Sequence, residues 1–148
     1  MDFPATRFAM VRQQVKWPDI SVFFSEHLGL LYKEAGKQQV SAGSPAGLYF
    51  VWDEKNQQTD MGAAITVPAG THLQGTVFRM EDIPASKAIF VTYTGPYDRI
   101  ADAHNSLDQY LANKKLQQKI PVIEQYISGP YNEKDSSKWI TKILYLVD

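Results

Sequence analysis

The chain has 148 residues, a formal charge of −1 and no cysteine. This length suits a single domain with its own hydrophobic core, and the lack of cysteine excludes disulfides, thiolate zinc sites and cysteine nucleophiles. The 15 basic and 16 acidic side chains lack the basic excess that is typical of nucleic-acid-binding domains, so we expect no direct contact with nucleic acid.

The N-terminal residues do not resemble a signal peptide, because Asp2 and Arg7 interrupt any apolar stretch. No apolar run approaches the roughly 18 residues that a membrane span requires. From these two observations we expect a cytoplasmic location and no membrane contact.

The first half of the chain reads as strand, helix, strand, strand. Residues 7–15 are rich in β-branched and aromatic side chains, which favours a strand. A helix is predicted after Pro18 and before Gly36 from an apolar stripe at helical spacing, formed by Ile20, Phe23, Phe24, Leu28 and Leu31. After a loop at 41–47, the segments 48–52 and 61–67 predict a hairpin.

The second half repeats this order after an irregular linker that holds a short expected strand at 76–80. A strand is predicted at 88–93, and Gly95-Pro96 then breaks the chain. The next apolar stripe predicts a second helix, with Ile100, Ala103, His104, Leu107 and Leu111 on one face. Strands at 122–127 and 140–147 follow, separated by a polar loop at 128–138.

These two halves, residues 7–68 and 87–148, suggest an internal duplication within one domain spanning 1–148. The helices align with a shift of 80 (100 − 20 for two isoleucines), and the last strands with a shift of 79 (144 − 65). We therefore expect an α+β fold of duplicated β-α-β-β halves with pseudo-two-fold symmetry. Both helices would cover one face of an antiparallel sheet, leaving a ligand cleft between the halves on the opposite face.

Glu124 is the residue of greatest chemical interest, because it interrupts the apolar strand 121–127. Strand alternation places Val122, Glu124 and Tyr126 on one face. Glu124 either lies on a solvated face or sits inside an aromatic cleft, where burial would raise its pKa and suit it to pair with a cation or act as a general base. Alternation also predicts that Tyr49 and Trp52 reach one cleft only if a β-bulge intervenes.

No cofactor or metal motif is present in the sequence. Gly-x-Ser-x-Gly, phosphate-loop and dinucleotide patterns are all missing. His27 and His104 lie on the apolar helix stripes without metal-ligand spacing, so we expect them to be core or interfacial residues. The expected metal and cofactor content is therefore none.

Two segments together resemble a known family. The motif Tyr93-Thr-Gly-Pro-Tyr-Asp98, an amphipathic helix and then Pro121-Val-Ile-Glu-Gln-Tyr126 are similar to the GyrI-like family. This family includes the effector-binding domains of bacterial multidrug-sensing transcription activators of the BmrR type. Segments 43–49 and 62–68 fit its first half, so the resemblance runs from about Phe8 to Val147.

The resemblance implies a stand-alone domain with a cleft for bulky, hydrophobic and often cationic molecules. It gives Glu124 the role of the acid that faces the ligand, with aromatic side chains stacking around it. The candidate lining residues, taken from this resemblance and from the strand pattern, are Tyr49, Trp52, Tyr93, Tyr126 and Trp139. Tyr93 stands where family members often carry a histidine.

Three functions stay open at this point. The first is small-molecule binding. The second is hydrolysis, with Glu124 as general base and Tyr49 as its partner. The third is a protein-interaction module that modulates a larger enzyme such as gyrase through the loop 128–137, which would involve a separate protein partner. Haem binding, known among relatives, is disfavoured because two of the three histidines lie on core-facing helix stripes. We expect a monomer or a weak dimer.

Overall fold

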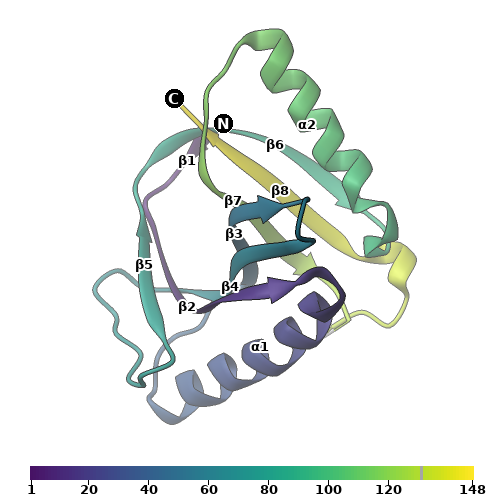
Figure 1. The fold of residues 1–148 in the computed structure, drawn as a ribbon. Helices are drawn as coiled ribbons and strands as arrows, with labels where there is room; N and C mark the ends of the chain where they lie inside the picture. The colour runs from purple at the N-terminus through teal and green to yellow at the C-terminus, as the bar shows by residue number, and fades with distance from the viewer. Residues whose placement is uncertain (131) are drawn as a thin grey trace.

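The computed structural model describes residues 1–130 and 132–148 and folds them into one sheet with two helices (Figure 1). The strands are β1 (Asp2–Phe3), β2 (Thr6–Lys16), β3 (Pro45–Asp53), β4 (Gln58–Val67), β5 (Arg79–Ile83), β6 (Ser86–Thr94), β7 (Gln118–Ser128) and β8 (Ile140–Val147). The helices are α1 (Ile20–Lys37) and α2 (Ile100–Lys114), with short 3-10 turns η1 (Trp17–Asp19), η2 (Tyr97–Arg99) and η3 (Ser136–Lys138).

The described strands form a single antiparallel sheet in the order β1-β6-β8-β7-β3-β4-β2-β5. The two halves of the chain meet where β3 pairs with β7, and this register sets Gly47 opposite Glu124 and Tyr49 opposite Val122. The predicted α+β fold with an antiparallel sheet is confirmed. The junction between the halves is therefore continuous backbone hydrogen bonding and not a gap.

Both helices pack on the same face of the sheet, as the sequence pattern predicts. Phe23, Leu31 and Ala35 of α1 join the buried side chains of β2 and β4, while Ala103 and Leu107 of α2 pack on β8. Apolar stripes at helical spacing need such a surface to bury them. Within the described part of the chain, neither helix has the length and apolar character that crossing a membrane demands.

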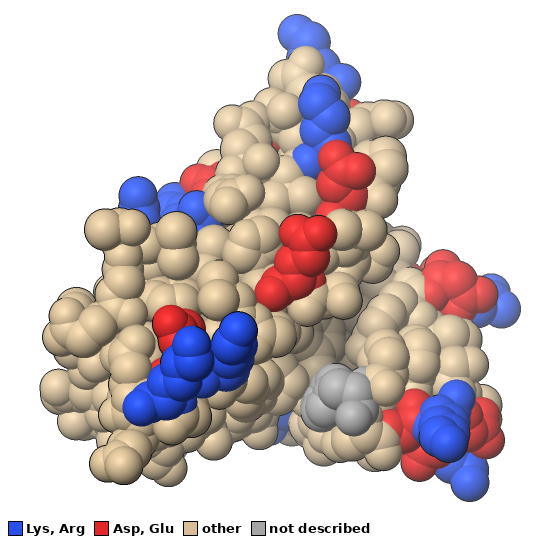
Figure 2. Space-filling view, turned by 90° about the horizontal axis from the view of Figure 1, so that it is seen from below, with Lys and Arg blue, Asp and Glu red and all other residues tan. Residues whose placement is uncertain are grey.

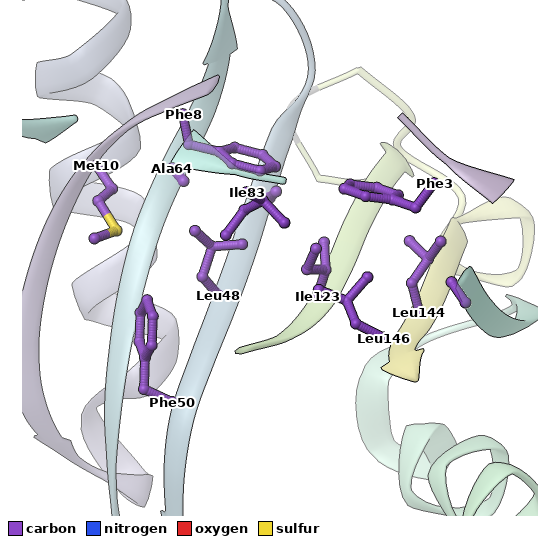
Figure 3. Close-up of a cluster of buried hydrophobic side chains, with 12 residues drawn as sticks. Phe3, Phe8, Met10, Leu48, Phe50, Ala64, Ile83, Ile123, Leu144 and Leu146 are labelled. Atoms are coloured by element: carbon purple, nitrogen blue, oxygen red, sulfur yellow. The ribbon is translucent and has the colours of Figure 1, made fainter. Parts of the chain in front are cut away.

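The opposite face of the sheet corrects the sequence prediction, which reserved it for a ligand. The sheet curls so that its edge strands β1 and β5 bring Phe3 and Ile83 into one buried cluster with Phe8 (Figure 3). Leu48 and Ile123 of the two central strands lie in the same cluster. Strand alternation sends every second side chain to this face, and the apolar ones of this cluster pack together as a core where the prediction placed a cleft.

Element boundaries differ from the predictions at a few points. β3 begins at Pro45, inside the predicted loop, because β4 and β7 both pair with its first residues. β5 lies at 79–83 instead of 76–80, and β1 has no counterpart in the prediction. α1 continues past Gly36 and ends before Gln39, whose φ is 57°. Residue 131 of the predicted polar loop lies outside the described residues.

The buried cluster on the curled face can be tested by mutation. Leu48→Ala removes a fully buried side chain from this face and is expected to lower the free energy of unfolding by about 2–5 kcal/mol, through lost burial plus a cavity. The matched change Leu30→Ala, at a leucine of α1 that is 36% exposed, is expected to cost less than about 1 kcal/mol. Urea denaturation measures both, and equal costs would contradict this assignment of the core.

Candidate functional site

A buried carboxylate lies at the middle of the sheet, on the face that carries the helices. The Tyr126 hydroxyl donates a hydrogen bond of 2.8 Å to Oε1 of Glu124. The Tyr49 hydroxyl lies 3.5 Å from the same oxygen and 3.3 Å from the Tyr126 hydroxyl. Glu124 and Tyr126, which strand alternation predicts on one face, therefore meet Tyr49 of the paired strand, but beside the helices and not on the opposite face.

Helix α2 supplies the carboxylate with a partner, His104, which the helical pattern predicted as a core or interfacial residue. His104 Nε2 lies 2.7 Å from Glu124 Oε2, and His104 Nδ1 lies 2.8 Å from the Tyr145 hydroxyl of β8. The helical stripe indicates that His104 faces the sheet. It does not indicate which strand residue lies beneath it, so the sequence alone did not pair His104 with Glu124.

The tyrosines around the carboxylate act as hydrogen-bond donors. Burial raises the pKa of the Tyr49 and Tyr126 hydroxyls well above the ordinary value, and the negative charge of Glu124 raises it further. Burial, followed by nearby Asp108, also raises the pKa of Tyr145. These phenols therefore stay protonated at neutral pH, so neither Tyr49 nor Tyr126 serves as a phenolate base.

Aromatic rings from both halves of the chain surround this point. Phe24 of α1 meets the Tyr126 ring edge to face at 5.4 Å, and Tyr97 of η2 lies 5.9 Å from the Tyr126 ring on another side. Trp139, between η3 and β8, packs on Tyr97 at 5.1 Å. Seen from below, where α1 lies, the molecule is hollowed by a groove whose walls carry few charged side chains (Figure 2). Phe24 and Tyr97 were absent from the predicted lining residues, although Tyr97 belongs to the motif that carries the family resemblance.

A β-bulge in β3 brings Trp52 to the same side as Tyr49. The register against β4 shifts between Tyr49 and Val51, and the Thr59 hydroxyl donates to the Val51 carbonyl at 2.8 Å. Trp52 consequently lies 5.9 Å from the Tyr49 ring and stacks on Trp17 at 4.9 Å. Strand alternation allows the two rings to share a face only with such a bulge, but no residue pattern in the sequence predicted one.

Tyr93 occupies a different environment from the other predicted lining residues. Its hydroxyl donates a hydrogen bond to the Pro96 carbonyl, and its ring packs against the apolar cluster under α2. Tyr93 therefore supports the turn that precedes Tyr97. Its described contacts give it a structural role in that turn and do not join it to Glu124.

Gly47 is a further residue of the site that the sequence analysis left unassigned. It lies opposite Glu124, and a Cβ atom there would meet Phe24 Cζ at 2.8 Å, the Tyr126 hydroxyl at 2.9 Å and Tyr49 Cε2 at 3.0 Å. The missing side chain is what allows these rings to close over the strand beside the carboxylate. A glycine within a strand, two residues before Tyr49, was the available signal.

Two surface hollows, of about 430 and 410 Å³, lie away from the carboxylate. The first is lined in part by Arg12 and Lys119, which already pair with Asp60 and Asp148. The second is lined mostly by apolar residues of β6 and α2. The charged residues that line them are not buried, whereas Glu124 is, which makes Glu124 the candidate centre.

Metal binding has no support in the described residues. No group of three or more His, Cys, Asp or Glu side chains there is arranged to hold an ion. His104 and Glu124 supply two donor atoms that already face each other, which is fewer than a structural zinc or calcium site uses.

Comparison with known proteins relates the whole chain to small-molecule-binding domains. The family model described as the GyrI-like small molecule binding domain matches residues 1–147. Comparison with curated protein sequences gives no match. The fold is shared with the EcmrR C-terminal domain, at 23% identity and a TM-score of 0.88, covering 100% of this chain and 94% of that one.

Other solved structures have the same fold at lower similarity or greater length. The EcmrR chain in the EcmrR–DNA complex has a TM-score of 0.87 at 23% identity. The match covers 100% of this chain and 56% of that one. SAV2435 bound to tetraphenylphosphonium has a TM-score of 0.69 at 15% identity, with 100% of this chain and 92% of that one covered. A hydrolase from Listeria innocua has a TM-score of 0.68 at 11% identity, with 100% and 91% covered.

The close packing at Gly47 predicts a strong and local effect of one methyl group. Gly47→Ala is expected to lower the free energy of unfolding by about 1–3 kcal/mol, because Phe24, Tyr49 and Tyr126 must all shift. Gly29→Ala on α1, where nothing lies within 4 Å, is expected to be neutral or to stabilise by up to about 1 kcal/mol. Thermal unfolding of both variants checks this, and a Gly47→Ala protein as stable as wild type would contradict the packing.

The His104–Glu124 contact predicts energetic coupling between the two residues. Glu124→Gln and His104→Gln are expected to be non-additive in a double-mutant cycle, with a coupling of about 1–3 kcal/mol in urea denaturation. The exposed pair of Arg99 in η2 and Asp102 in α2, whose side chains are 3.5 Å apart, is the control and is expected to couple by less than about 0.5 kcal/mol. Additive effects at His104 and Glu124 would show that they do not interact in solution.

Proposed function

The chain belongs to the GyrI-like small molecule binding domain family, and from this premise we propose that its carboxylate site receives a bulky hydrophobic cation. One observation carries the proposal. Glu124 is buried among aromatic rings, and its ion-pair partner in the described chain is a histidine, not a permanently charged lysine or arginine. Its negative charge is therefore available to a ligand that brings a positive one.

The energies involved are sufficient for useful affinity. A cation about 4 Å from a carboxylate gains about 4 kcal/mol at an effective dielectric constant of 20. Each cation–π contact with a ring adds about 0.5–2 kcal/mol, and burial of apolar ligand surface adds about 25 cal/mol per Å². After the entropic cost of association, micromolar binding, which needs about −8 kcal/mol, is a reasonable expectation.

The hydrogen bonds of Glu124 favour one type of cation. Oε1 already accepts from Tyr126, and Oε2 faces His104 Nε2. A primary ammonium or guanidinium group would have to displace one of these partners to form its own hydrogen bonds. A phosphonium, a quaternary ammonium or a delocalised aromatic cation needs no hydrogen bond, so it binds through charge and ring contacts alone.

Entry of such a ligand requires the aromatic side chains to move. Phe24 and Tyr97 both pack against Tyr126, and the rings around Gly47 leave no room for an added methyl group. Rotation of these rings about their side-chain torsions would open space beside Glu124 without disturbing the sheet. SAV2435, which shares this fold, is described as bound to tetraphenylphosphonium, and this makes the same cation a suitable probe.

Hydrolysis is the second candidate, with Glu124 as base and Tyr49 as its partner. As a base, Glu124 would have to release one of two donors before it could accept a proton from water. Tyr49, with its raised pKa, remains a donor. The geometry therefore favours binding over turnover. The interaction-module alternative depends on the loop 128–137, which includes residue 131 outside the described residues, and no described contact there favours it.

The proposal predicts that tetraphenylphosphonium raises the melting temperature of the wild-type protein by several degrees at concentrations well above Kd, through mass action. Glu124→Gln keeps the shape of the side chain and removes its charge, so it is expected to weaken binding at least tenfold by calorimetry. Tyr126→Phe is expected to weaken it less, because it removes one hydrogen bond and keeps the Glu124 side chain in the site.

The control is Glu54→Gln, at an exposed glutamate in the turn between β3 and β4. This variant has the same charge change and is expected to bind like the wild type. Neutral triphenylphosphine oxide separates charge from aromatic bulk, and its affinity is expected to change little in Glu124→Gln. Equal loss of tetraphenylphosphonium binding in the Glu54 and Glu124 variants would overturn the proposal, because the effect would then be one of overall charge.

A further inference from the structure

We infer that His104 is a built-in competitor for the ligand, an internal cation whose proton is expelled when an external cation binds beside Glu124. The inference rests on the proposed function and adds to it the residue that sets the charge of the site. The class of ligand that the site accepts then depends on whether the His104 imidazole is protonated.

The contact geometry gives His104 the place a ligand cation would otherwise take. Its Nε2 lies 2.7 Å from Oε2 of Glu124, which is the distance of a charge-assisted hydrogen bond. The side chain of His104 is 26% exposed and that of Glu124 is 9% exposed. The imidazole can therefore exchange a proton with solvent directly, while the carboxylate behind it is largely shielded.

Both ring nitrogens of His104 keep a hydrogen-bond partner in either protonation state. When the ring is charged, Nδ1–H donates to the Tyr145 hydroxyl, which can donate in turn to the His104 carbonyl at 3.4 Å. When the ring is neutral, Nε2–H still donates to Glu124 and the Tyr145 hydroxyl turns to donate to Nδ1. The proton that leaves is thus the one on Nδ1, and rotation of a single hydroxyl completes the change.

The titratable groups around His104 come from three elements. Glu124 faces it from β7 and Tyr145 from β8, and Asp108 of its own helix lies near the Tyr145 hydroxyl. Tyr49 and Tyr126 lie beyond Glu124 and stay uncharged because their pKa values are raised. Within the immediate pair, a charged imidazole gives a net charge of zero and a neutral imidazole gives −1.

The net charge of the His104–Glu124 pair determines which class of ligand the site prefers. With a charged His104, the carboxylate is already neutralised and an external cation meets like charge, so a neutral aromatic molecule is the better guest. With a neutral His104, the same pocket carries one uncompensated negative charge and prefers a cation. Imidazole is the side chain that changes charge between pH 5 and 8, so both ligand classes fall within the ordinary range of conditions.

The two helices offer a contrast that supports a special role for His104. In the alignment of the helices by a shift of 80 (104 − 24), Phe24 is the residue that corresponds to His104. Phe24 packs on Tyr126 and His104 contacts Glu124, so both positions point at the same centre. One half of the chain gives the site an apolar ring, and the other gives it a titratable one.

The test measures tetraphenylphosphonium binding by calorimetry from pH 5.5 to 8.5 in the wild type and in His104→Gln. Glutamine can still donate a hydrogen bond to Glu124 but carries no charge. In the wild type, affinity is expected to rise with pH by up to tenfold per pH unit and then level off, because binding releases one proton. In His104→Gln it is expected to be nearly flat and, at pH 5.5, at least fivefold tighter than in the wild type.

Three further measurements make the result specific. Repeating the wild-type titration at pH 5.5 in buffers of different ionisation enthalpy counts the protons released, and the expected value approaches one, falling to near zero in His104→Gln. His27→Gln changes the histidine of α1, whose Nδ1 faces the Phe23 carbonyl, and is expected to keep the wild-type pH profile. Triphenylphosphine oxide is expected to bind without the rise in affinity at high pH.

The outcomes separate the two levels of the proposal. If tetraphenylphosphonium binds the wild type and fails with Glu124→Gln, but His104→Gln keeps the wild-type pH profile, the competitor role is wrong and the proposed function stands. If binding at pH 8.5 is absent from the wild type, or is equal in Glu124→Gln, the proposed function fails and the inference fails with it. If His104→Gln binds more weakly at every pH, His104 supports the site and does not compete for it.

Discussion

A carboxylate buried in the middle of a sheet has to be paired, and the rest of the site follows from that requirement. Burial of an unpaired charge costs several kcal/mol, so Glu124 must collect donors or change its protonation state. Tyr126 and Tyr49 supply hydroxyls from the sheet, and His104 supplies an imidazole from α2. Tyr49 comes from the first half of the chain and the other two donors from the second, so the carboxylate is contacted from both halves.

The pairing of β3 with β7 is what places these groups within reach of each other. Gly47 stands opposite Glu124 and contributes no side chain, so the aromatic rings can lie over the strand. The bulge after Tyr49 then turns Trp52 to the same side, where it extends the ring surface toward Trp17. A site built this way is rigid in its backbone and adjustable in its rings, which suits recognition by shape and charge more than by directed hydrogen bonds.

Much of the fold could be predicted from the sequence because it depends on local periodicity. The apolar stripes located both helices, and alternation located the principal strands and put Glu124 and Tyr126 on one face. The prediction placed Glu124 on the face opposite the helices, whereas it lies beside them, since alternation reveals which residues share a side but not which side the helices cover. Phe24, Tyr97 and His104 joined the site only through contacts between distant segments, and no spacing in the sequence encodes those contacts.

The sequence by itself determined an α+β domain of the GyrI-like family with a glutamate in an aromatic strand, because these depend on residue order along single elements. The tertiary structure decided that the glutamate is buried, that a histidine from a helix opposes it, and that the face beneath the curl is filled with apolar side chains. The physical reason is that burial and pairing are set by strand register and helix placement. Both arise from contacts between residues far apart in the chain.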